Sequence, residues 1–416
     1  MPMLIKQFLN CLCFVLVDLA SKGGYNVFHS ISPIRNDYYM SELYFDNAAT
    51  TKVCKEAADA AYSAMTETYG NPSSTHKKGR EASVILKDSR NRIAKTLGCK
   101  PSEVYFTSCG SESDNWALIG GAHLRHHEGC HIISSEVEHD AIRKTLDYLE
   151  SQGFKITRLS PSEDGSIKVN DVIAAINDET IMVSLMLVNN ETGAVTDIAG
   201  IAKAVHKVNP RILVHTDAVQ GYMKIPFSLK KMDVDMLSIS GHKIHAPKGV
   251  GALYIKEGLH LPSYIHGGSQ ENKMRAGTEG LPQIAAMGIA AELAYRNQKR
   301  YIESMSSCKK KIVSDINSRI IDAKIIESDS PHIISVSFPG YRSEVIMNFL
   351  ESKDIFVSRS SACKKGARSH VLEAMGLAPE IIDGTIRISL SRDTTENDCT
   401  ILVDALHEAT VSLAHK

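Results

Sequence analysis

The chain has 416 residues, of which 43% are hydrophobic and 23% are charged. This composition is that of an ordinary globular protein, and the length is enough for one large domain and a smaller one. Lysine and arginine number 47 against 48 aspartates and glutamates, so the net charge of −1 gives no electrostatic reason to expect a nucleic acid or an anionic membrane as partner.

The nine cysteines are irregularly spaced, and no two of them form a CxxC pair. This pattern favours neither a zinc ribbon nor a disulfide framework, so we expect no metal site. Free thiols fit a reducing compartment, for which we take the cytoplasm.

Residues 8–20 form an apolar run that has the length of a signal-peptide core but is too short to span a bilayer. Two interpretations stay open: a cleaved or interfacial segment, and an appended extension. We favour the extension, because "MSELYFDNAATT" from Met40 onward is typical of the start of a folded protein. Residues 1–39 are therefore predicted to lie outside the fold.

Between residues 53 and 255, amphipathic helical stretches such as 79–97 alternate with short apolar runs. The expected strands are 104–108, 131–135, 181–188, 212–217, 234–240 and 251–255. This alternation predicts an α/β domain with a mostly parallel central sheet over residues 40–300, whose first ~15 residues can pack with the smaller domain. In such sheets the ligand crevice lies beyond the carboxyl ends of the strands.

A long helical stretch is expected at 279–310, and the pattern changes after it. Strands expected within 332–340, 355–363 and 385–391 alternate with helices near 342–352, 369–376 and 395–412. We interpret residues 301–416 as a smaller α+β domain that shares a cleft with the first domain.

Two charged residues stand at the ends of expected strands. A buried lysine such as Lys243, in "SISGHK", loses its proton readily, which Schiff-base chemistry needs. Asp217, in "VHTDAVQG", can supply the carboxylate that a pyridine nitrogen requires. Taken singly, the lysine can equally belong to a surface loop and the aspartate can be a helix N-cap.

Three further stretches are polar at the same edge of the expected sheet. In "TSCGSESDN" (107–115), the Gly110 amide and the Ser111 hydroxyl at a helix start can cradle a phosphate, or simply cap the helix. His139 follows another strand and can stack on a cofactor ring or cap a helix. Asn190, in "LVNNETG", is suited to orienting oxygens of a ring or substrate. Cys363 lies in a polar, basic stretch unlike the buried setting usual for free cysteines.

Together these motifs identify a resemblance. The chain resembles the cysteine desulfurases of the iron–sulfur-cluster-assembly and nitrogen-fixation type, in the class V aminotransferase group of fold-type I pyridoxal 5'-phosphate (PLP) enzymes. The resemblance covers nearly everything after Met40. It rests on "YFDNAATT", "GNPSSTHKKG", "TSCGSESDN", "EHDA", "VNNETG", "HTDAVQ", "SGHKIHAPKG", "HGGSQENKMRAGTE", "SRSSAC" and "IRISLS".

The resemblance implies a role for each matching residue. Lys243 would bind PLP covalently and later move the Cα proton of the substrate, and His139 would stack on the ring. Arg387 would grip the substrate carboxylate with its bidentate fork, helped by Asn190 and Asn47. Cys363 would be the nucleophile. PLP itself would be held by Gly110, Ser111, Asn190, Asp217, Gln220, Ser240, His242, Lys243 and, from the neighbouring subunit of a homodimer, Thr278.

The implied activity converts L-cysteine to L-alanine and leaves the sulfur as a persulfide on Cys363, from which a sulfur acceptor takes it. The acceptor would be an iron–sulfur scaffold or a protein of tRNA or cofactor thiolation. A selenocysteine lyase or a cysteine sulfinate desulfinase is the alternative, since those leaving groups depend less on an enzyme thiol. An aminotransferase and a non-catalytic assembly scaffold are weaker alternatives, because neither needs this set of residues.

The chain departs from the family pattern at three places. Cys109 and Ser360 stand where glycine is usual, and the segment after Cys363 is about two residues shorter than in many relatives. Arg359, Lys364 and Lys365 either lower the pKa of the thiol or form a solvated loop face. These departures leave the identity of the sulfur acceptor open.

Overall fold

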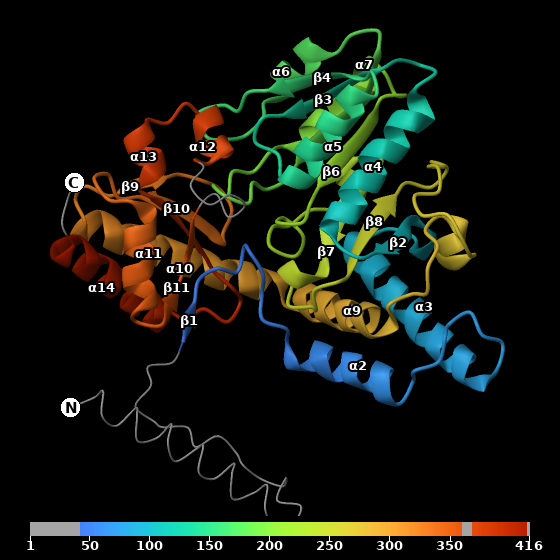
Figure 1. Cartoon of the computed structure of the whole chain (residues 1–416), viewed down its shortest axis with the longest axis horizontal. Coiled ribbons are helices and arrows are strands. Elements are labelled where there is room, and N and C mark those ends of the chain that lie inside the picture. The colour runs from blue at the N-terminus through green and yellow to red at the C-terminus, as the bar shows by residue number, and fades with distance from the viewer. Residues whose placement is uncertain (1–41, 360–367, 414–416) are drawn as a thin grey trace, which may run out of the picture. The chain divides into compact units, whose positions relative to one another are not determined.

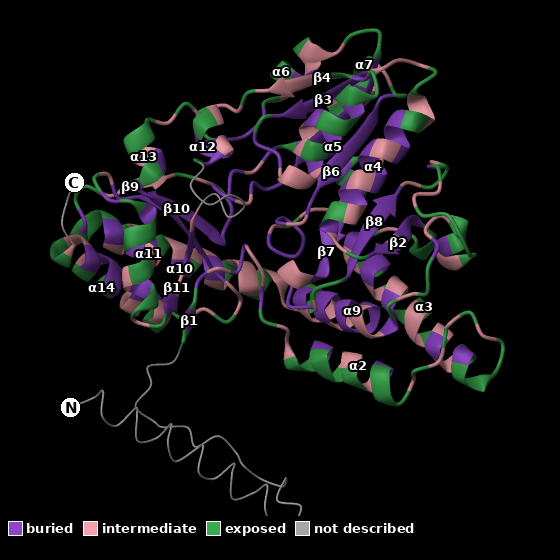
Figure 2. Ribbon diagram, viewed as in Figure 1, coloured by how far each residue is buried: buried purple, intermediate pink, exposed green. Residues whose placement is uncertain are grey.

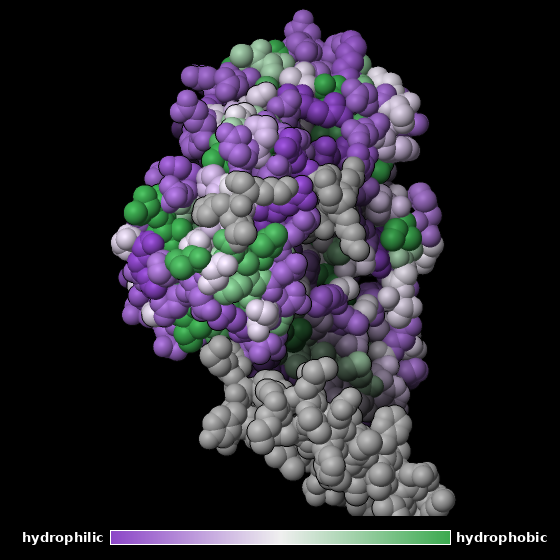
Figure 3. All heavy atoms as spheres, turned by 60° about the vertical axis from the view of Figure 1, so that its left-hand side comes forward, coloured by the Kyte–Doolittle hydropathy of each residue, from purple (hydrophilic) through white to green (hydrophobic). Residues whose placement is uncertain are grey.

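The computed structural model describes residues 42–359 and 368–413. The predicted extension 1–39, as well as Ser360 and Cys363, therefore lies outside the described residues. From Glu42 onward the chain forms one compact unit, and the predicted division after residue 300 stays a prediction. Within the described ranges, no helix is long and apolar enough to cross a membrane. The face in Figure 3 is mainly hydrophilic, with small hydrophobic patches between polar side chains.

The described strands form three sheets (Figure 1). The largest, called the large sheet, is ordered β2 (Val104–Thr107), β8 (Gly251–Ile255), β7 (Met236–Ser240), β6 (Leu213–Asp217), β5 (Thr180–Met186), β3 (His131–Ser135) and β4 (Lys155–Leu159). Neighbours from β7 to β4 are parallel, and β8 is antiparallel to β7 and β2. The prediction of a mostly parallel α/β sheet is confirmed.

Side chains alternate between the two faces of the large sheet. Ile133 and Val183 pack into one hydrophobic cluster with helices α3 (Lys77–Leu97), α7 (Ile198–Val208) and α9 (Leu281–Arg296). Ile132 and Met182, one residue earlier on each strand, pack into another with α4 (Gly110–Arg125) and α5 (Asp140–Ser151). Both faces are covered, which explains why β5, β6 and β7 are buried throughout (Figure 2).

Two local features differ from the sequence prediction. Strand β4 was not predicted, because "KITRL" is a half-exposed edge strand without a continuous apolar run. The predicted long helix at 279–310 is two helices, α9 and α10 (Gln298–Arg319). At the break the Asn297 side-chain amide donates to the Leu293 carbonyl (2.9 Å), and Asn297 leaves helical geometry (φ −114°, ψ 8°).

The C-terminal elements lie together, in orange and red in Figure 1, around a second core. Four antiparallel strands form the small sheet, in the order β12 (Ser358–Arg359), β13 (Thr385–Ser389), β10 (Ile333–Ser337) and β9 (Lys324–Ile326). Strand β1 (Leu43–Tyr44) pairs in parallel with β11 (Ile355–Phe356), and Phe45 is buried in the same core. The start of the described chain thus packs with its C-terminal part.

The remaining elements are short helices and the C-terminal helices. They are α2 (Lys55–Thr66), α6 (Val169–Ala175), α8 (Leu229–Met232), α11 (Ser343–Glu351), α12 (His370–Ala374), α13 (Pro379–Asp383), α14 (Glu396–Ser412) and the 3₁₀ turns Pro101–Glu103, Gly241–Lys243 and Gln270–Lys273. Because β5, β6 and β7 are parallel, their carboxyl ends meet at one edge of the large sheet, where polar residues gather.

Candidate active site

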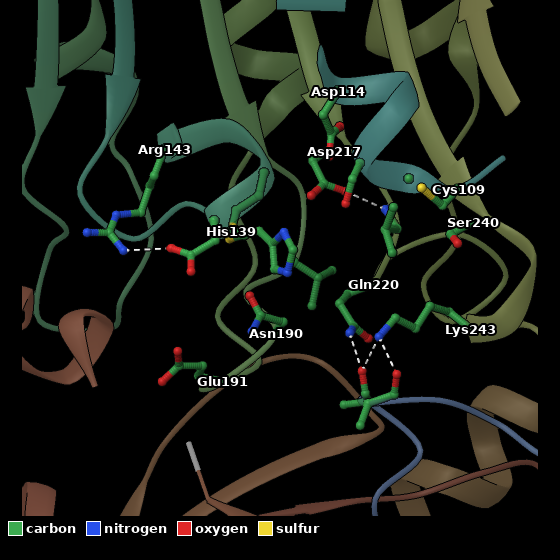
Figure 4. Close-up of a pocket in the computed structure, with 18 of the residues that line it drawn as sticks. Cys109, Asp114, His139, Arg143, Asn190, Glu191, Asp217, Gln220, Ser240 and Lys243 are labelled. Atoms are coloured by element: carbon green, nitrogen blue, oxygen red, sulfur yellow. Dashed lines mark hydrogen bonds and ion pairs between the residues drawn. The ribbon is translucent and has the colours of Figure 1, made fainter. Parts of the chain in front are cut away.

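A cavity of about 470 Å³ lies at this edge, and residues of both the large and the small sheet line it (Figure 4). Its size is that of a site for a small molecule or cofactor. The structure brings ten of the predicted site residues together there: Gly110, Ser111, His139, Asn190, Asp217, Gln220, Ser240, His242, Lys243 and Arg387. Their individual roles remain predictions.

Lys243 stands in the 3₁₀ turn directly after β7, and its side chain reaches back over the cavity. Its Nζ donates to the carbonyls of Ala48 (2.6 Å) and Ala49 (2.7 Å). Burial and, after it, the Arg387 charge lower the pKa of the amine to about 8, while the Asp217 charge opposes them. The amine can therefore lose its proton close to neutral pH, as a nucleophile or base must.

Asp217 ends strand β6 and is buried. Its Oδ1 accepts the backbone N–H of Val219 (2.8 Å) in the turn that follows, so it is not a helix N-cap. Burial raises the pKa of this carboxyl, while the nearby His139 and Lys243 hold the pKa down. A buried carboxylate at this place is suited to a cationic partner in the cavity.

His139 caps a helix and also lines the cavity, where its stacking on a cofactor ring stays a prediction. It is the N-cap of α5, where its Nδ1 accepts the backbone N–H of Ala141 (3.1 Å). This bond, from which the tautomer is assigned, leaves the ring proton on Nε2 when the imidazole is neutral. Figure 4 shows the ring pointing into the cavity between Asp217 and Asn190.

The start of helix α4 forms an anion cradle. Its N-cap, Cys109, makes no side-chain cap hydrogen bond, so the first N–H groups of this helix remain available. A Cβ on Gly110 would lie 2.8 Å from Cγ2 of Val219, so only glycine fits. The buried Ser240 Oγ beside it has no hydrogen-bond partner among the described residues. The first N–H groups of α4 and the Ser240 hydroxyl can all donate hydrogen bonds to a phosphate, so the cradle fits a phosphate group.

Two more predicted cofactor residues border this cradle. Gln220 donates through Nε2 to the Ala48 carbonyl (2.8 Å), one of the carbonyls that Lys243 also uses. His242 lies with Nδ1 3.3 Å from Oγ1 of Thr50, and burial together with the Lys243 charge lowers its pKa to about 4. His242 is therefore neutral near pH 7, and can act on a phosphate as a hydrogen-bond donor rather than as a charge.

Arg387 enters the cavity from strand β13 of the small sheet, and its residue is only 2% exposed. Its Nη1 donates to the Asn190 carbonyl and its Nη2 to Oδ1 of Asp46, both at 2.8 Å. Its buried Nε has no hydrogen-bond partner among the described residues. An arginine with an unused donor in a cavity is suited to binding a carboxylate.

Comparison with known proteins agrees with this geometry. Residues 43–402 match the class-V aminotransferase family. The chain is 40% identical over 370 residues to the cysteine desulfurase IscS of Dictyoglomus turgidum, and 38% identical over 372 residues to that of Clostridium botulinum strain Kyoto. Each match covers 88% of this chain and 93% of the relative. A solved NifS-like protein, 37% identical, superposes with a TM-score of 0.85 over 89% of this chain and 100% of its own.

The chain belongs to the class-V aminotransferases, among the cysteine desulfurases. The family resemblance inferred from the sequence motifs is thereby confirmed. These enzymes use PLP, which fits a site with a lysine, a buried carboxylate and an anion cradle.

Two residues that the desulfurase resemblance implicated do not line the cavity. Asn47 is buried, and its Nδ2 donates to the carbonyls of Tyr44 (3.0 Å) and Ser389 (2.9 Å), so the structure gives its predicted substrate contact no support. Thr278 is exposed and lies outside the lining. Its predicted contact needs a neighbouring subunit.

The sequence prediction also missed residues of this desulfurase site. Asp114 lies four residues after Gly110 on α4, and helical spacing alone places the two on one face. Glu191 directly follows Asn190 and is bonded by the Ser369 hydroxyl. Asp46 accepts a hydrogen bond from Arg387. The sequence did not predict this pairing, because the two residues lie 341 positions apart in the chain.

Proposed function

We propose that this protein is a PLP-dependent L-cysteine desulfurase that produces L-alanine and carries the sulfur as a persulfide on Cys363. The observation that carries the proposal is the meeting of Lys243, Asp217 and Arg387 around one cavity with an anion cradle at its edge. The membership of the chain among the cysteine desulfurases supports it.

The described residues fit PLP. The N-terminus of α4 with Gly110, Ser111 and the unpartnered Ser240 hydroxyl would hold the phosphate. Asp217 would face the ring nitrogen, and Lys243 would hold the cofactor covalently. When bound, PLP supplies a ring that accepts electrons from the substrate Cα.

The side chains have distinct tasks in this proposal. Arg387 binds the substrate carboxylate and fixes the substrate's orientation. The Lys243 amine, whose pKa of about 8 makes the neutral form accessible, removes the Cα proton and returns it. Asp217 keeps its negative charge opposite the ring nitrogen, so that the proton there is retained.

Sulfur transfer requires the Cys363 thiolate. A bond forms between its sulfur and the substrate sulfur, and the substrate's C–S bond breaks. The electron pair of that bond stays on the three-carbon fragment, which takes up protons and leaves as alanine. The enzyme retains a persulfide, and no external oxidant or reductant is needed.

The proposal extends to assembly and compartment. Thr278 would complete the phosphate site of the other subunit in a homodimer. Its side chain is exposed, so another subunit can reach it. The six cysteines in the described ranges are all free thiols, which supports a reducing compartment such as the cytoplasm. A sulfur-acceptor protein would then take the persulfide sulfur.

The test combines product and persulfide. Purified enzyme with PLP and labelled L-cysteine is expected to release one alanine for each sulfur transferred, and the label should map to Cys363. Cys363→Ala should bind L-cysteine but form no persulfide, whereas Cys109→Ala, which removes a thiol from the same cavity, should still form it. Normal alanine release by Cys363→Ala would contradict the proposal, and a Cys363-independent rate on selenocysteine would favour a lyase instead.

A further inference from the structure

A second carboxyl group stands beside Asp217. Asp114, on the first turns of α4, lines the cavity and is 1% exposed. Its Oδ1 is buried and has no hydrogen-bond partner among the described residues. Figure 4 shows the Asp114 side chain directed at Asp217. None of the functions assigned above uses this group.

No cation compensates Asp114 among its described neighbours. The groups that face it are Asp217 on β6, the Ser238 hydroxyl on β7, Glu138 after β3, Cys109 before α4 and His215 on β6. The nearest nitrogen is Nε2 of His215, 3.8 Å from Oδ1.

His215 is itself neutral. Its Nδ1 lies 2.9 Å from the Ser184 hydroxyl and its Nε2 lies 3.0 Å from the Ser238 hydroxyl. Burial lowers its pKa to about 3. A neutral imidazole whose two nitrogens already have hydroxyl partners cannot stabilise an ionised Asp114.

Two buried carboxyl groups this close do not both ionise at neutral pH. Burial and the Asp217 charge both raise the pKa of Asp114 well above its usual range. Asp217 is better supported as an anion, because it accepts the Val219 N–H and faces His139 and Lys243. Asp114, rather than Asp217, is therefore the group that takes up a proton.

We propose that Asp114 stays a neutral carboxylic acid, so that Asp217 alone presents one negative charge to the ring nitrogen. This inference rests on the proposed function only for the role of Asp217. With Asp114 neutral, no second charge beside Asp217 attracts water or a metal ion into the cavity that both residues line.

Infrared difference spectroscopy tests the protonation state directly. The spectrum of wild-type apoprotein minus Asp114→Asn at neutral pH should contain the C=O band of a protonated carboxyl group, shifted in D₂O. Asp59→Asn is the matched control, because the Asp59 side chain is 63% exposed, and should remove carboxylate bands only. Carboxylate bands in the Asp114 difference spectrum would overturn the proposal. Wild-type protein with ¹³C-labelled aspartate gives the same readout should the variant not fold.

PLP affinity separates this inference from the proposed function. Asp114→Asn replaces a neutral group by a neutral group, so its dissociation constant for PLP should stay within about threefold of wild type at neutral pH. A loss of more than about tenfold in a folded variant would show that Asp114 is charged, and would overturn the inference. If Asp217→Asn instead binds PLP as well as wild type, the proposed role of Asp217 fails, while the infrared band still decides the state of Asp114.

Discussion

The large sheet and the small sheet contribute to one cavity in different ways. The large sheet supplies Asp217 and Lys243 within a few residues of strand ends, so local backbone geometry places them. The small sheet supplies Arg387 from the middle of β13, and bonds to Asp46 and to the Asn190 carbonyl, distant in the chain, place it. In the proposed function, the first region sets the chemistry and the second sets how the substrate is held.

Removing Lys243 should have the largest effect, since it deletes the reactive group of the large sheet. Lys243→Ala is expected to lower kcat for alanine formation by about a thousandfold or more, because no other base takes the Cα proton. The visible absorption of covalently bound PLP should disappear as well. Lys248→Ala, an exposed lysine five residues further on, is the control. A Lys243→Ala enzyme that still forms alanine and still shows this visible absorption would contradict the proposed role of Lys243.

The second-largest effect is expected from the hydrogen bond between Ser369 and Glu191. Glu191, 5% exposed, is bonded by Ser369, the N-cap of α12. Burial raises the pKa of Glu191 to about 7, although the Ser369 bond opposes this. Because the folded-state pKa is raised, the contribution of Glu191 to stability is full below pH ~4.5 and is lost as the pH rises through about 7.

Glu191→Gln removes this dependence while keeping an acceptor for the Ser369 hydroxyl. The free energy of unfolding of the variant relative to wild type should therefore rise between pH ~4.5 and ~8, by up to about 3 kcal/mol. Urea unfolding at the two pH values measures it, with the exposed Glu56→Gln as control for the loss of one charge. If the difference in free energy of unfolding between Glu191→Gln and wild type does not change with pH, Glu191 is already ionised in the folded protein.

How far the sequence could predict the site follows from the same contrast. Asp217, His139 and Lys243 were predictable, because a polar residue at the end of a buried strand or shortly after it falls at the carboxyl edge of the sheet. Glu191 was not, because its hydrogen-bond partner, Ser369, lies 178 positions away in the chain. The strand predictions of the large sheet succeeded where both faces are covered and failed at β4, whose residues are half-exposed. Cys363 lies outside the described residues, so its role rests on the sequence alone.

A smaller effect is expected from Arg387→Lys. A lysine retains the charge but loses the planar fork, so KM for L-cysteine should rise by about 30-fold while kcat changes less. Arg143→Lys is the matched control, because Arg143 lines the same cavity and is likewise paired with an aspartate, Asp140 (2.9 Å), but has no proposed contact with the substrate. A fall in kcat at unchanged KM would mean that Arg387 serves the chemistry, and would erase the distinction between the two sheets.

The smallest effect is expected at Cys109, where the family resemblance leads us to expect glycine. Its backbone is fully extended (φ −173°, ψ 174°), a conformation that any residue adopts without strain, and its side chain makes no cap bond to α4. The cradle therefore depends on Gly110, where a Cβ would collide with Val219, and not on the residue before it. Cys109→Gly should change the dissociation constant for PLP by less than about twofold, whereas Gly110→Val should abolish binding. Equal losses in both variants would show that the thiol, rather than the helix N-terminus, shapes the phosphate site.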